Sequence, residues 1–426
     1  MSERRYRVLA VAAHPVQYMA HIFRRMANHP AFDLHVAYCT LRGAEPARDP
    51  EFDTNIKWDV PLLDGYFWSA VPKCGSGPES LFGLCNPGLW KLIRAGNFDA
   101  VLCFTGYQCV SFWIALLAAK SSKTAFVFGT DATTLVPRDG RTWKILPKKI
   151  FWRRLFRLAD QVIVPSSGSL ELMLSLGLPF ERVTLTPYSV DNDWWIRQHS
   201  QVDRAGARAM WGASQKDAVV LFCAKFQPWK RPIDLLRAFA KANIQNALLI
   251  FAGEGPLRPR LESEAAVLGI ASQVRFPGFV NQSQLPAVYA SADLMVLPSE
   301  YEPFAVVVNE AMCCGCPVVV SDRVGAARDL VVPVAPQFVF PYGDVDALAH
   351  ILKDALTDRT RLQAIAEAAR THIQTWSPRR NIAATLDAIR IGVTRARGST
   401  DKGKAPSHAI SKESAVHGND GVNGLL

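Results

Sequence analysis

The chain has 426 residues, of which 49% are hydrophobic and 20% are charged, and its formal net charge is +10. This composition is ordinary for a globular protein, and the length suits two domains. The longest apolar run, Cys109–Ala119, is too short to span a bilayer, which takes roughly 18–20 residues. No nucleic-acid-binding signature accompanies the positive charge, so we expect no nucleic-acid partner. The charge then reflects a phosphorylated small substrate, an anionic lipid surface, or basic groups that simply face water.

Nine cysteines are scattered over the chain. Such a distribution in a long chain predicts a reduced, cytoplasmic compartment, and Met1–Arg7 lacks the apolar stretch of a signal peptide. Cys313, Cys314 and Cys316 stand close together, but no second ligand pair follows at zinc spacing. We therefore expect these three side chains to pack in the core, and we expect no metal site.

Short β-rich runs alternate with helical patterns through the first half of the chain. An irregular stretch with many Pro and Gly residues, from Leu41 to about Pro87, interrupts this alternation. Strands separated by helices predict a parallel sheet with helices on both faces, here over residues 1–190. The expected strands are Arg7–Ala13, Asp33–Cys39, Asp99–Phe104, Thr124–Phe128, Gln161–Pro165 and Arg182–Thr186.

The second half repeats the pattern over residues 217–376, after a polar linker at 191–216 without strand character. The fold class is therefore α/β, with two Rossmann-like domains whose strand ends face each other across a cleft. A helix at 377–393 follows, with a crossing back to the first domain as an option, and residues 394–426 are expected to be a disordered tail. The expected strands are Ala218–Cys223, Ala247–Ala252, Val274–Pro277, Leu294–Leu297, Pro317–Ser321 and Phe338–Phe340.

The strongest motif pairs two glutamates across a strand-to-helix turn. Glu302 lies in the loop, Pro303 suits a first helical turn, and Glu310 follows on a helix expected over Phe304–Cys313. We expect the two carboxylates to lie on either side of a bound diphosphate, with Glu310 towards a ribose diol and Glu302 towards a sugar ring. The alternative is a surface helix with two solvated glutamates.

The start of the same helix is a candidate anion-binding turn. Backbone N–H groups in a first helical turn have no acceptor within the helix, and the helix dipole adds partial positive charge there. The groups concerned are the amides of Phe304, Ala305 and Val306. We expect these amides to bind the diphosphate.

The motif resembles the signature of a known enzyme family. Glu-Pro-Phe, Asn-Glu-Ala-Met and Gly-Cys-Pro follow one another here, with seven residues between Glu302 and Glu310. This order is similar to that of glycosyltransferase family 4, the group 1 glycosyltransferases related to glycogen and sucrose synthases. The resemblance implies a GT-B fold, a nucleoside-diphosphate sugar bound by the second domain, an acceptor bound by the first, and a retaining reaction. It covers Ala218–Val331 closely and the first domain only loosely.

Two lysines after the first strand of the second domain add to the resemblance. Lys225 and Lys230 have the spacing at which family members carry a basic pair on the donor diphosphate. Negative charge builds on the diphosphate as its bond to the sugar breaks, and two cations stabilise this charge without a metal ion. The resemblance therefore implies neither a metal nor another cofactor. The alternative is a pair of surface lysines flanking a turn at Pro228 and Trp229.

Two further turns concern the nucleotide. Gly253 lies in a strand-to-helix turn whose glycines let a ligand approach the backbone closely. Val280 follows the next strand, where family members commonly hold the base through main-chain groups. Both segments are equally well explained as plain tight turns.

The acceptor side is less distinctive. Many relatives carry a glycine-rich loop after their first strand, whereas this chain has Gln17 and Tyr18 there as substitute hydrogen-bond donors. Tyr107 follows another expected strand and is a candidate for the acceptor side. Asp131 follows the next strand, where it either orients a sugar hydroxyl or acts as a base, or else caps the following helix.

The segment Arg141–Arg157 is basic, aromatic and amphipathic. Lys149 and Arg153 fall on one helical face, while Phe151 and Leu155 fall on another. A segment of this kind either lies on anionic lipid, as a peripheral contact on the inner membrane face, or packs its apolar face on the sheet as an ordinary surface helix.

These observations predict a retaining glycosyltransferase that uses a nucleoside-diphosphate sugar. Its acceptor is not identified by the sequence, and its product would be a polysaccharide, glycolipid or other glycoconjugate. Glu302 and Asp131 are the candidate catalytic residues. Two alternatives keep the fold but change the function, because fold alone does not decide it. They are a nucleotide-sugar epimerase and a non-catalytic nucleotide-sugar-binding partner.

Overall fold

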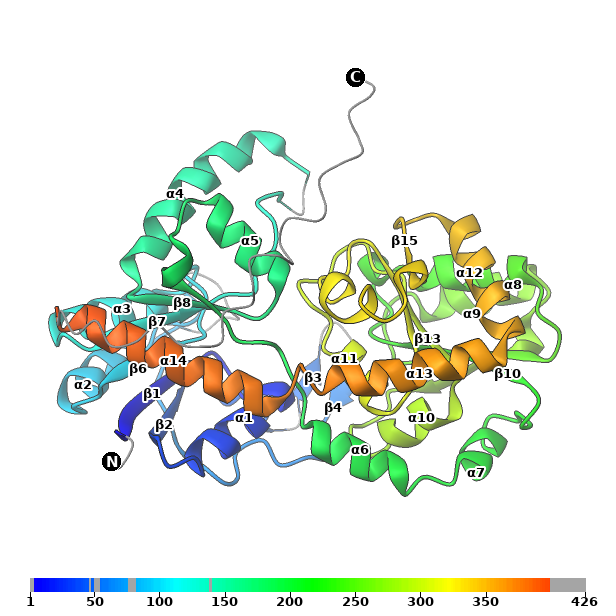
Figure 1. Cartoon of the computed structure of the whole chain (residues 1–426), viewed down its shortest axis with the longest axis horizontal. Coiled ribbons are helices and arrows are strands. Elements are labelled where there is room, and N and C mark those ends of the chain that lie inside the picture. Colours follow the sequence, from blue (N-terminus) through cyan, green and yellow to red (C-terminus); the bar gives the residue numbers. More distant parts are fainter. Residues whose placement is uncertain (1–3, 46, 50–53, 76–81, 138–139, 399–426) are drawn as a thin grey trace.

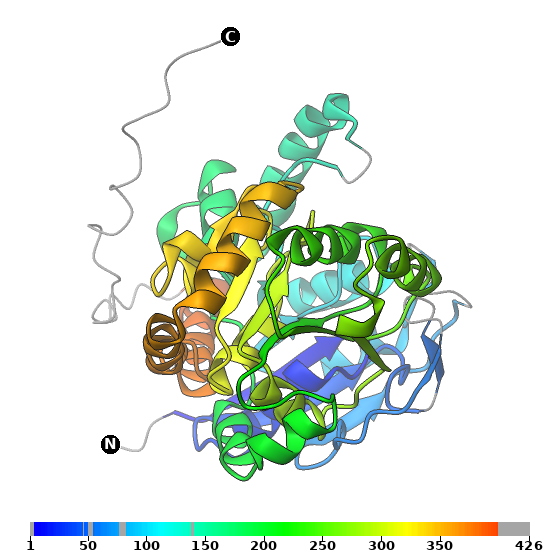
Figure 2. The same cartoon turned by 90° about the vertical axis from the view of Figure 1, so that its right-hand side faces the viewer.

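A computed structural model describes residues 4–45, 47–49, 54–75, 82–137 and 140–398 of the chain. Two α/β domains lie side by side in it, and the chain crosses from one to the other twice (Figure 1). In Figure 2 the second domain lies in front of the first. The GT-B architecture of two Rossmann-like domains is therefore confirmed.

The first domain is built on a seven-stranded parallel sheet in the order β5-β2-β1-β6-β7-β8-β9. Side chains of β1, an inner strand of this sheet, pack on both faces, with Leu9 and Val11 in one core and Val8 and Ala10 in the other. Burial on both faces explains why such strands read as continuous apolar runs. The strands are β1 (Tyr6–Ala12), β2 (Phe32–Tyr38), β5 (Phe67–Ala70), β6 (Ala100–Cys103), β7 (Ala125–Gly129), β8 (Gln161–Val164) and β9 (Val183–Leu185).

The second domain is built on a six-stranded parallel sheet in the order β12-β11-β10-β13-β14-β15. Both sheets add strands first to one side of their initial strand and then to the other, so a topological switch point lies beside β1 and beside β10. Ligands of such sheets bind at the carboxyl ends of the strands next to this point. The strands are β10 (Ala218–Cys223), β11 (Ala247–Ala252), β12 (Val274–Gly278), β13 (Leu294–Leu297), β14 (Val318–Ser321) and β15 (Val339–Phe340).

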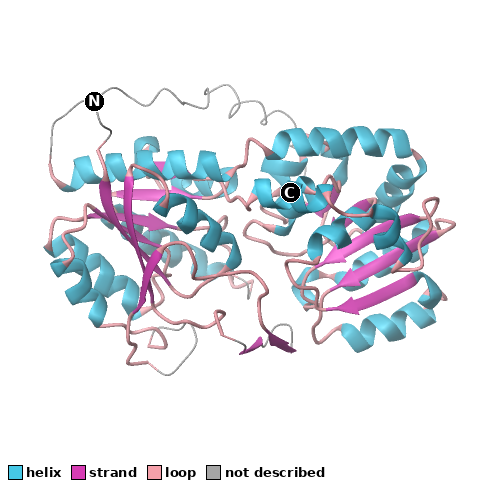
Figure 3. Cartoon of the chain, turned by 90° about the horizontal axis from the view of Figure 1, so that it is seen from below, coloured by secondary structure: helices cyan, strands magenta, loops and turns pink. Residues whose placement is uncertain are grey.

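Helices cover the faces of both sheets (Figure 3). Those of the first domain are α1 (Gln17–Ala27), α2 (Gly88–Ala95), α3 (Val110–Ser121), α4 (Ile145–Leu158) and α5 (Ser167–Ser175). Those of the second domain are α8 (Pro232–Ala242), α9 (Arg258–Val267), α10 (Leu285–Ser291), α11 (Val307–Cys313), α12 (Val345–Thr357) and α13 (Arg359–Ile373). None of the helices within the described ranges has both the length and the apolar content that crossing a membrane requires.

The two crossings between the domains are helical. The linker forms α6 (Asn192–Ser200) and α7 (Arg204–Ala209), and Trp195 of α6 is buried in the core of the second domain. The last helix, α14 (Pro378–Ala396), returns to the first domain, where Leu386 and Ile389 join the core under its sheet (Figure 1). The chain therefore ties the two domains together at both crossings.

The structure departs from the sequence analysis at two places. The irregular stretch after Leu41 contains the edge strand β5 and a small hairpin of β3 (Ala47–Asp49) and β4 (Thr54–Ile56). None of the four side chains of β5 is fully buried, so this strand lacks the apolar run that marks the others. The helix α14 also continues past the expected start of the tail at residue 394, and residues 399–426 of that tail lie outside the described residues.

Candidate active site

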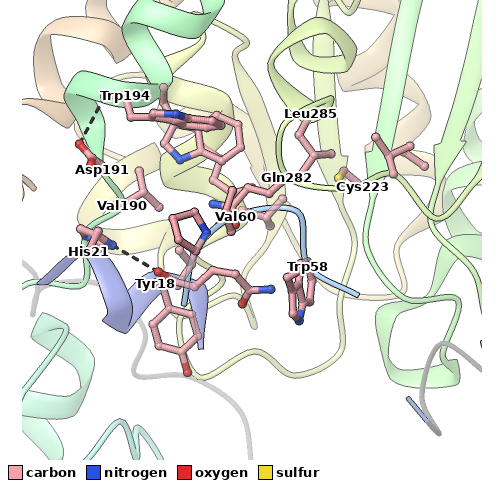
Figure 4. Close-up of a pocket in the computed structure, with 18 of the residues that line it drawn as sticks. Tyr18, His21, Trp58, Val60, Val190, Asp191, Trp194, Cys223, Gln282 and Leu285 are labelled. Atoms are coloured by element: carbon pink, nitrogen blue, oxygen red, sulfur yellow. Dashed lines mark hydrogen bonds between the residues drawn. The ribbon is translucent and has the colours of Figure 1, made fainter. Parts of the chain in front are cut away.

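A cavity of about 670 Å³ lies between the two domains, at the carboxyl ends of both sheets (Figure 4). Gln17 and Tyr18, in the first turn of α1, line it from the first domain. Cys223 at the end of β10 and Gly253 after β11 line it from the second. The cavity therefore occupies the position where ligands bind in open α/β sheets.

About half of the residues that the sequence analysis selected as candidates line the cavity. These residues are Gln17, Tyr18, Gly253, Val280, Val306 and Glu310. The other candidates lie outside its lining, and each has a different environment. They are Tyr107, Asp131, Lys225, Lys230, Glu302, Phe304 and Ala305.

Glu310 is a carboxyl group held at the cavity wall with one hydrogen bond. The Tyr289 hydroxyl donates to Glu310 Oε2 at 2.9 Å, and no cation of the described residues lies within ion-pair distance of it. Burial raises the pKa of Glu310 to about 7, and the hydrogen bond from Tyr289 opposes this shift only in part. A carboxylate with spare acceptor capacity, facing an apolar cavity, suits a pair of hydroxyl groups from a ligand.

Glu302 is buried and forms an ion pair with Lys230. Its side chain is 10% exposed and that of Lys230 is 18% exposed, and the Ser299 hydroxyl donates to Glu302 Oε1 at 3.1 Å. A donor phosphate bound at Lys230 would therefore share this lysine with Glu302. Lys225 is half-buried and also has an interaction partner.

Close glycine packing fixes the loops that carry these groups. The Gly325 amide donates to the Glu302 carbonyl at 3.0 Å, and a Cβ atom at Gly325 would stand 2.0 Å from the Pro303 carbonyl oxygen. Gly253 has φ +151°, and a Cβ atom there would stand 2.1 Å from the Ala224 carbonyl oxygen. Only glycine permits either approach, so these two residues set the position of the loops around the cavity.

The turn before α11 differs from the expected helical start. Pro303 does not lie in a first helical turn, because Ala305 has φ 85° and the helix begins only at Val307. The amides of Phe304, Ala305 and Val306 form no hydrogen bond with an acceptor of the described residues. The turn thus keeps unpaired backbone donors beside the cavity. The helix that follows it, α11, has only seven residues.

Aromatic rings join the domains behind this turn. Tyr18 of α1 contacts Tyr188 at 5.7 Å between ring centroids, Tyr188 contacts Phe304 at 5.3 Å, and Phe304 stacks on Trp376 at 5.7 Å. Phe304 is 2% exposed, so its side chain packs at the domain junction instead of meeting a ligand. Asp131 is exposed and lies close enough to Tyr188 to act on it electrostatically.

Tyr107 does not reach the cavity. Its hydroxyl accepts a hydrogen bond from Trp152 Nε1 at 2.9 Å, and its ring contacts Phe151 and Trp152. The side chain of Tyr107 is thus engaged by α4 outside the lining of this cavity, and its assignment to the acceptor side stays a prediction.

The first domain contributes a polar wall that the sequence analysis did not identify. His21, Arg24 and Arg25 of α1 line the cavity next to Gln17 and Tyr18. Their positions fall on one face of the helix, at spacings of three, four and seven residues from one another and from Gln17 and Tyr18. This spacing is the feature of the sequence that could have identified them. Burial lowers the pKa of His21 to about 4, so the ring is neutral at neutral pH.

Arg25 connects this wall to the linker. Its guanidinium donates to Asp191 at 2.7 Å and to Asp193 at 2.9 Å. Burial opposes a charge on Asp191, but the hydrogen bond and charge of Arg25 keep the pKa of Asp191 below its ordinary value. Asp191 also accepts from the backbone of Trp194 at the start of α6, so one carboxylate holds both the helix start and the first domain.

Comparison with known proteins decides the family. Residues 203–372 match the family model described as glycosyl transferases group 1, and residues 15–189 match the glycosyl transferase 4-like domain. The chain belongs to the group 1 glycosyltransferases. The earlier resemblance is thereby confirmed.

Two curated relatives illustrate how far this similarity extends. An uncharacterized glycosyltransferase of Methanocaldococcus jannaschii is 34% identical over 46% of this chain and 51% of its own length. A D-inositol 3-phosphate glycosyltransferase of Streptomyces avermitilis is 33% identical over 70% of this chain and 66% of its own. The chain spans about half the length, or less, of the first curated relatives that it matches.

A solved structure shares the fold of this glycosyltransferase. Anabaena HepE, crystallised with UDP and glucose, superposes with a TM-score of 0.66, covering 92% of this chain and 99% of that one at 19% identity. Identity at this level shows the common GT-B architecture. Among the described residues of the glycosyltransferase, no three His, Cys, Asp or Glu side chains are grouped as metal ligands would be.

Proposed function

We propose that this group 1 glycosyltransferase moves a sugar, with retention of configuration, from a nucleoside-diphosphate donor to an acceptor hydroxyl in glycoconjugate synthesis. The observation that carries the proposal is the buried carboxyl of Glu310 at the wall of an interdomain cavity, where Tyr289 is its one hydrogen-bond donor among the described residues. A ribose diol supplies the two donors that an ionised Glu310 lacks, and the apolar surroundings suit a nucleoside.

The donor diphosphate would lie towards Lys225 and Lys230. The cationic side chain of Lys230 and the unpaired amides at Ala305 and Val306 meet the charge that grows on the leaving diphosphate. Glu302, held by Lys230 and Ser299, would orient the sugar between them. The proposal assigns charge stabilisation to these groups and requires no metal ion.

Retention is proposed to follow a front-face route, in which the acceptor approaches on the side of the departing diphosphate. The thiol nearest the proposed nucleotide, Cys223, is an unsuitable covalent nucleophile, because burial raises its pKa to about 12 and keeps it protonated. Asp131 remains a proposed acceptor-side residue, since it lies next to Tyr188 at the domain junction.

Peripheral membrane contact through Arg141–Arg157 remains a further proposal. Apolar side chains are exposed along this segment, with Trp143 at 69%, Leu146 at 66% and Ile150 at 46%, among lysines and arginines. Such a surface binds anionic lipid through both apolar burial and charge. Co-sedimentation with anionic vesicles should fall for Ile150→Glu, and equal binding to zwitterionic vesicles would contradict a charge-dependent contact.

The test of the proposed function is a calorimetric screen of UDP-, GDP-, ADP- and TDP-sugars, followed by NMR of the anomeric proton in the product. UDP is tested first because HepE was crystallised with it. We expect one nucleotide to bind in the cavity and the product to keep the donor's anomeric configuration. Inversion would refute the retaining route, and isomerised donor in the absence of acceptor would identify an epimerase.

A further inference from the structure

A short segment of the first domain, Lys57–Pro61, lies against the second domain at one end of the cavity; we call it the strap. It follows the β3–β4 hairpin, which lies between the domains in Figures 1 and 3. Asn281, in the loop after β12, donates from Nδ2 to the Lys57 carbonyl at 2.7 Å, and its Oδ1 accepts from the Asp59 amide at 3.3 Å. One side-chain amide thus pairs with both backbone groups around Trp58.

A second set of hydrogen bonds joins Asp59 of the strap to Ser283, two residues after Asn281 in the same loop. The Ser283 amide donates to Asp59 Oδ1 at 3.2 Å, and the Ser283 hydroxyl donates to Asp59 Oδ2. Because Asn281 and Ser283 are both held by the strap, the residue between them, Gln282, is fixed from either side. The strap therefore positions a residue of the second domain as well as its own Trp58.

Trp58 and Gln282 both line the cavity (Figure 4). The Trp58 ring meets Phe279 edge to face, with ring centroids 5.7 Å apart. Gln282 Oε1 is buried and has no hydrogen-bond partner. An unpaired buried acceptor costs free energy unless a ligand supplies a donor, so this atom marks a polar contact point in an otherwise apolar corner with Val280 and Leu285.

This corner has the chemistry that recognises a nucleobase. A base has flat apolar faces, which suit the Trp58 ring and the side chains of Val280 and Leu285, and its edge carries N–H groups, which suit Gln282 Oε1. We infer that the strap forms one wall of the nucleobase subsite, with Trp58 against the base and Gln282 accepting from its edge. The inference rests on the proposed function, and it makes donor recognition a task of both domains.

The experiment measures the dissociation constants of UDP, GDP and ADP, and of inorganic pyrophosphate as a probe without a base, by calorimetry on the full chain. For the nucleotide that binds the wild type most tightly, Trp58→Ala should weaken binding about tenfold, because stacking of a base on an aromatic ring is lost. Gln282→Leu, which keeps the side-chain size, should weaken it about fivefold. Pyrophosphate affinity should stay unchanged in both variants. Trp90→Ala, on α2 and 41% exposed, is the matched control.

The outcomes separate this inference from the proposed function. If no nucleotide binds the wild type, the proposed function fails. If the nucleotide binds the wild type and both variants equally well, the proposed function stands and the nucleobase subsite does not include the strap. If nucleotide and pyrophosphate weaken together, Trp58 acts on the structure of the site, and the inference is overturned. Trp58→Phe and Gln282→Leu keep the test decisive if Trp58→Ala does not fold.

Discussion

The two walls of the cavity come from domains with the same strand order around a switch point, yet their side chains are arranged in opposite ways. The wall of the second domain carries the carboxyl of Glu310, which Tyr289 holds, while Glu302 is held by Lys230 in the loop before the same helix, outside the cavity lining. The wall of the first domain carries cations, of which Arg25 is paired with Asp191 and Asp193, and groups without a partner among the described residues. Arg24 has no carboxylate partner among the described residues.

This difference distinguishes the expected tasks of the two walls. Groups that are already held in place need no reorganisation when charge develops, which favours the second domain for stabilising the leaving diphosphate. Unpaired groups such as His21 Nε2, which is buried without a hydrogen-bond partner, favour the first domain for contacts that only a bound ligand completes. Substitutions of Glu302 and Glu310 should therefore change catalysis and nucleotide binding, whereas substitution of the ion-paired Arg25 of α1 should act mainly through domain contacts.

The largest effect is expected for Glu302→Gln. Loss of the carboxylate removes the partner of Lys230 and the group proposed to orient the sugar, so kcat should fall at least about 100-fold, as for other fixed electrostatic groups. The dissociation constant of the nucleotide should change only a few-fold. Steady-state kinetics and calorimetry measure the two effects.

The control for this prediction is Glu300→Gln, two residues away in the same loop. Glu300 has a side chain that is 52% exposed and lies 3.7 Å from Arg231, so its loss should leave kcat unchanged. A similar fall in both variants would mean that the loop as a whole, and not the Glu302 carboxylate, supports catalysis. Unimpaired turnover in Glu302→Gln would contradict its proposed role.

The next effect is a pH dependence at Glu310. Its pKa is raised from 4.5 to about 7 by burial, so its contribution to stability is present below pH 4.5 and is lost as the pH rises through about 7. At about 1.4 kcal/mol per pKa unit the loss is at most about 3 kcal/mol. Glu310→Gln should therefore be more stable than the wild type at about pH 8, and urea unfolding across this range measures the difference.

The same substitution should weaken nucleotide binding about tenfold at about pH 8, because an ionised Glu310 accepts both ribose hydroxyls and a neutral amide does not. Below pH 7 the wild type is increasingly protonated, so the ratio of the two dissociation constants should shrink. The titration of the nucleotide's own phosphate cancels in this ratio. A ratio that stays constant from about pH 6 to about pH 8 would show that Glu310 does not bind the ribose.

The sequence candidates that line the cavity from the second domain depend on short-range signals. Glu310 lies in a strand-turn-helix segment, and Gly253 and Val280 each follow a strand end, so their positions follow from local structure and from where parallel strands end. The strands themselves were predictable because burial on both faces leaves continuous apolar runs. Both features depend on neighbours in the sequence.

What escaped prediction depends on contacts between distant segments. Lys230 and Glu302 form an ion pair although they are 72 residues apart in the sequence, and Asp59 and Ser283 are hydrogen-bonded although they are 224 residues apart. No rule of sequence spacing predicts either pair. Pro303 suggested a helical start, but the close approach of Gly325 holds the turn in another conformation. The strap lies in the irregular stretch after Leu41. The many Pro and Gly residues of this stretch gave no indication that it contains an ordered contact between the domains.

The smallest effect is expected for Arg25→Gln, which breaks the contact between the first wall and the linker. The side chains of Arg25, Asp191 and Asp193 are 36%, 33% and 60% exposed, so screening by water limits the loss of stability to about 1 kcal/mol. The pKa of Asp191 is lowered in the folded protein, so the stabilisation is present above pH 3.8, its ordinary value, and is lost as the pH falls further. Arg24→Gln, one position away and without a carboxylate partner among the described residues, should leave stability unchanged. If Arg24→Gln destabilised the protein as much as Arg25→Gln in urea unfolding at neutral pH, the effect would belong to α1 itself, and the two walls would not be coupled through this ion pair.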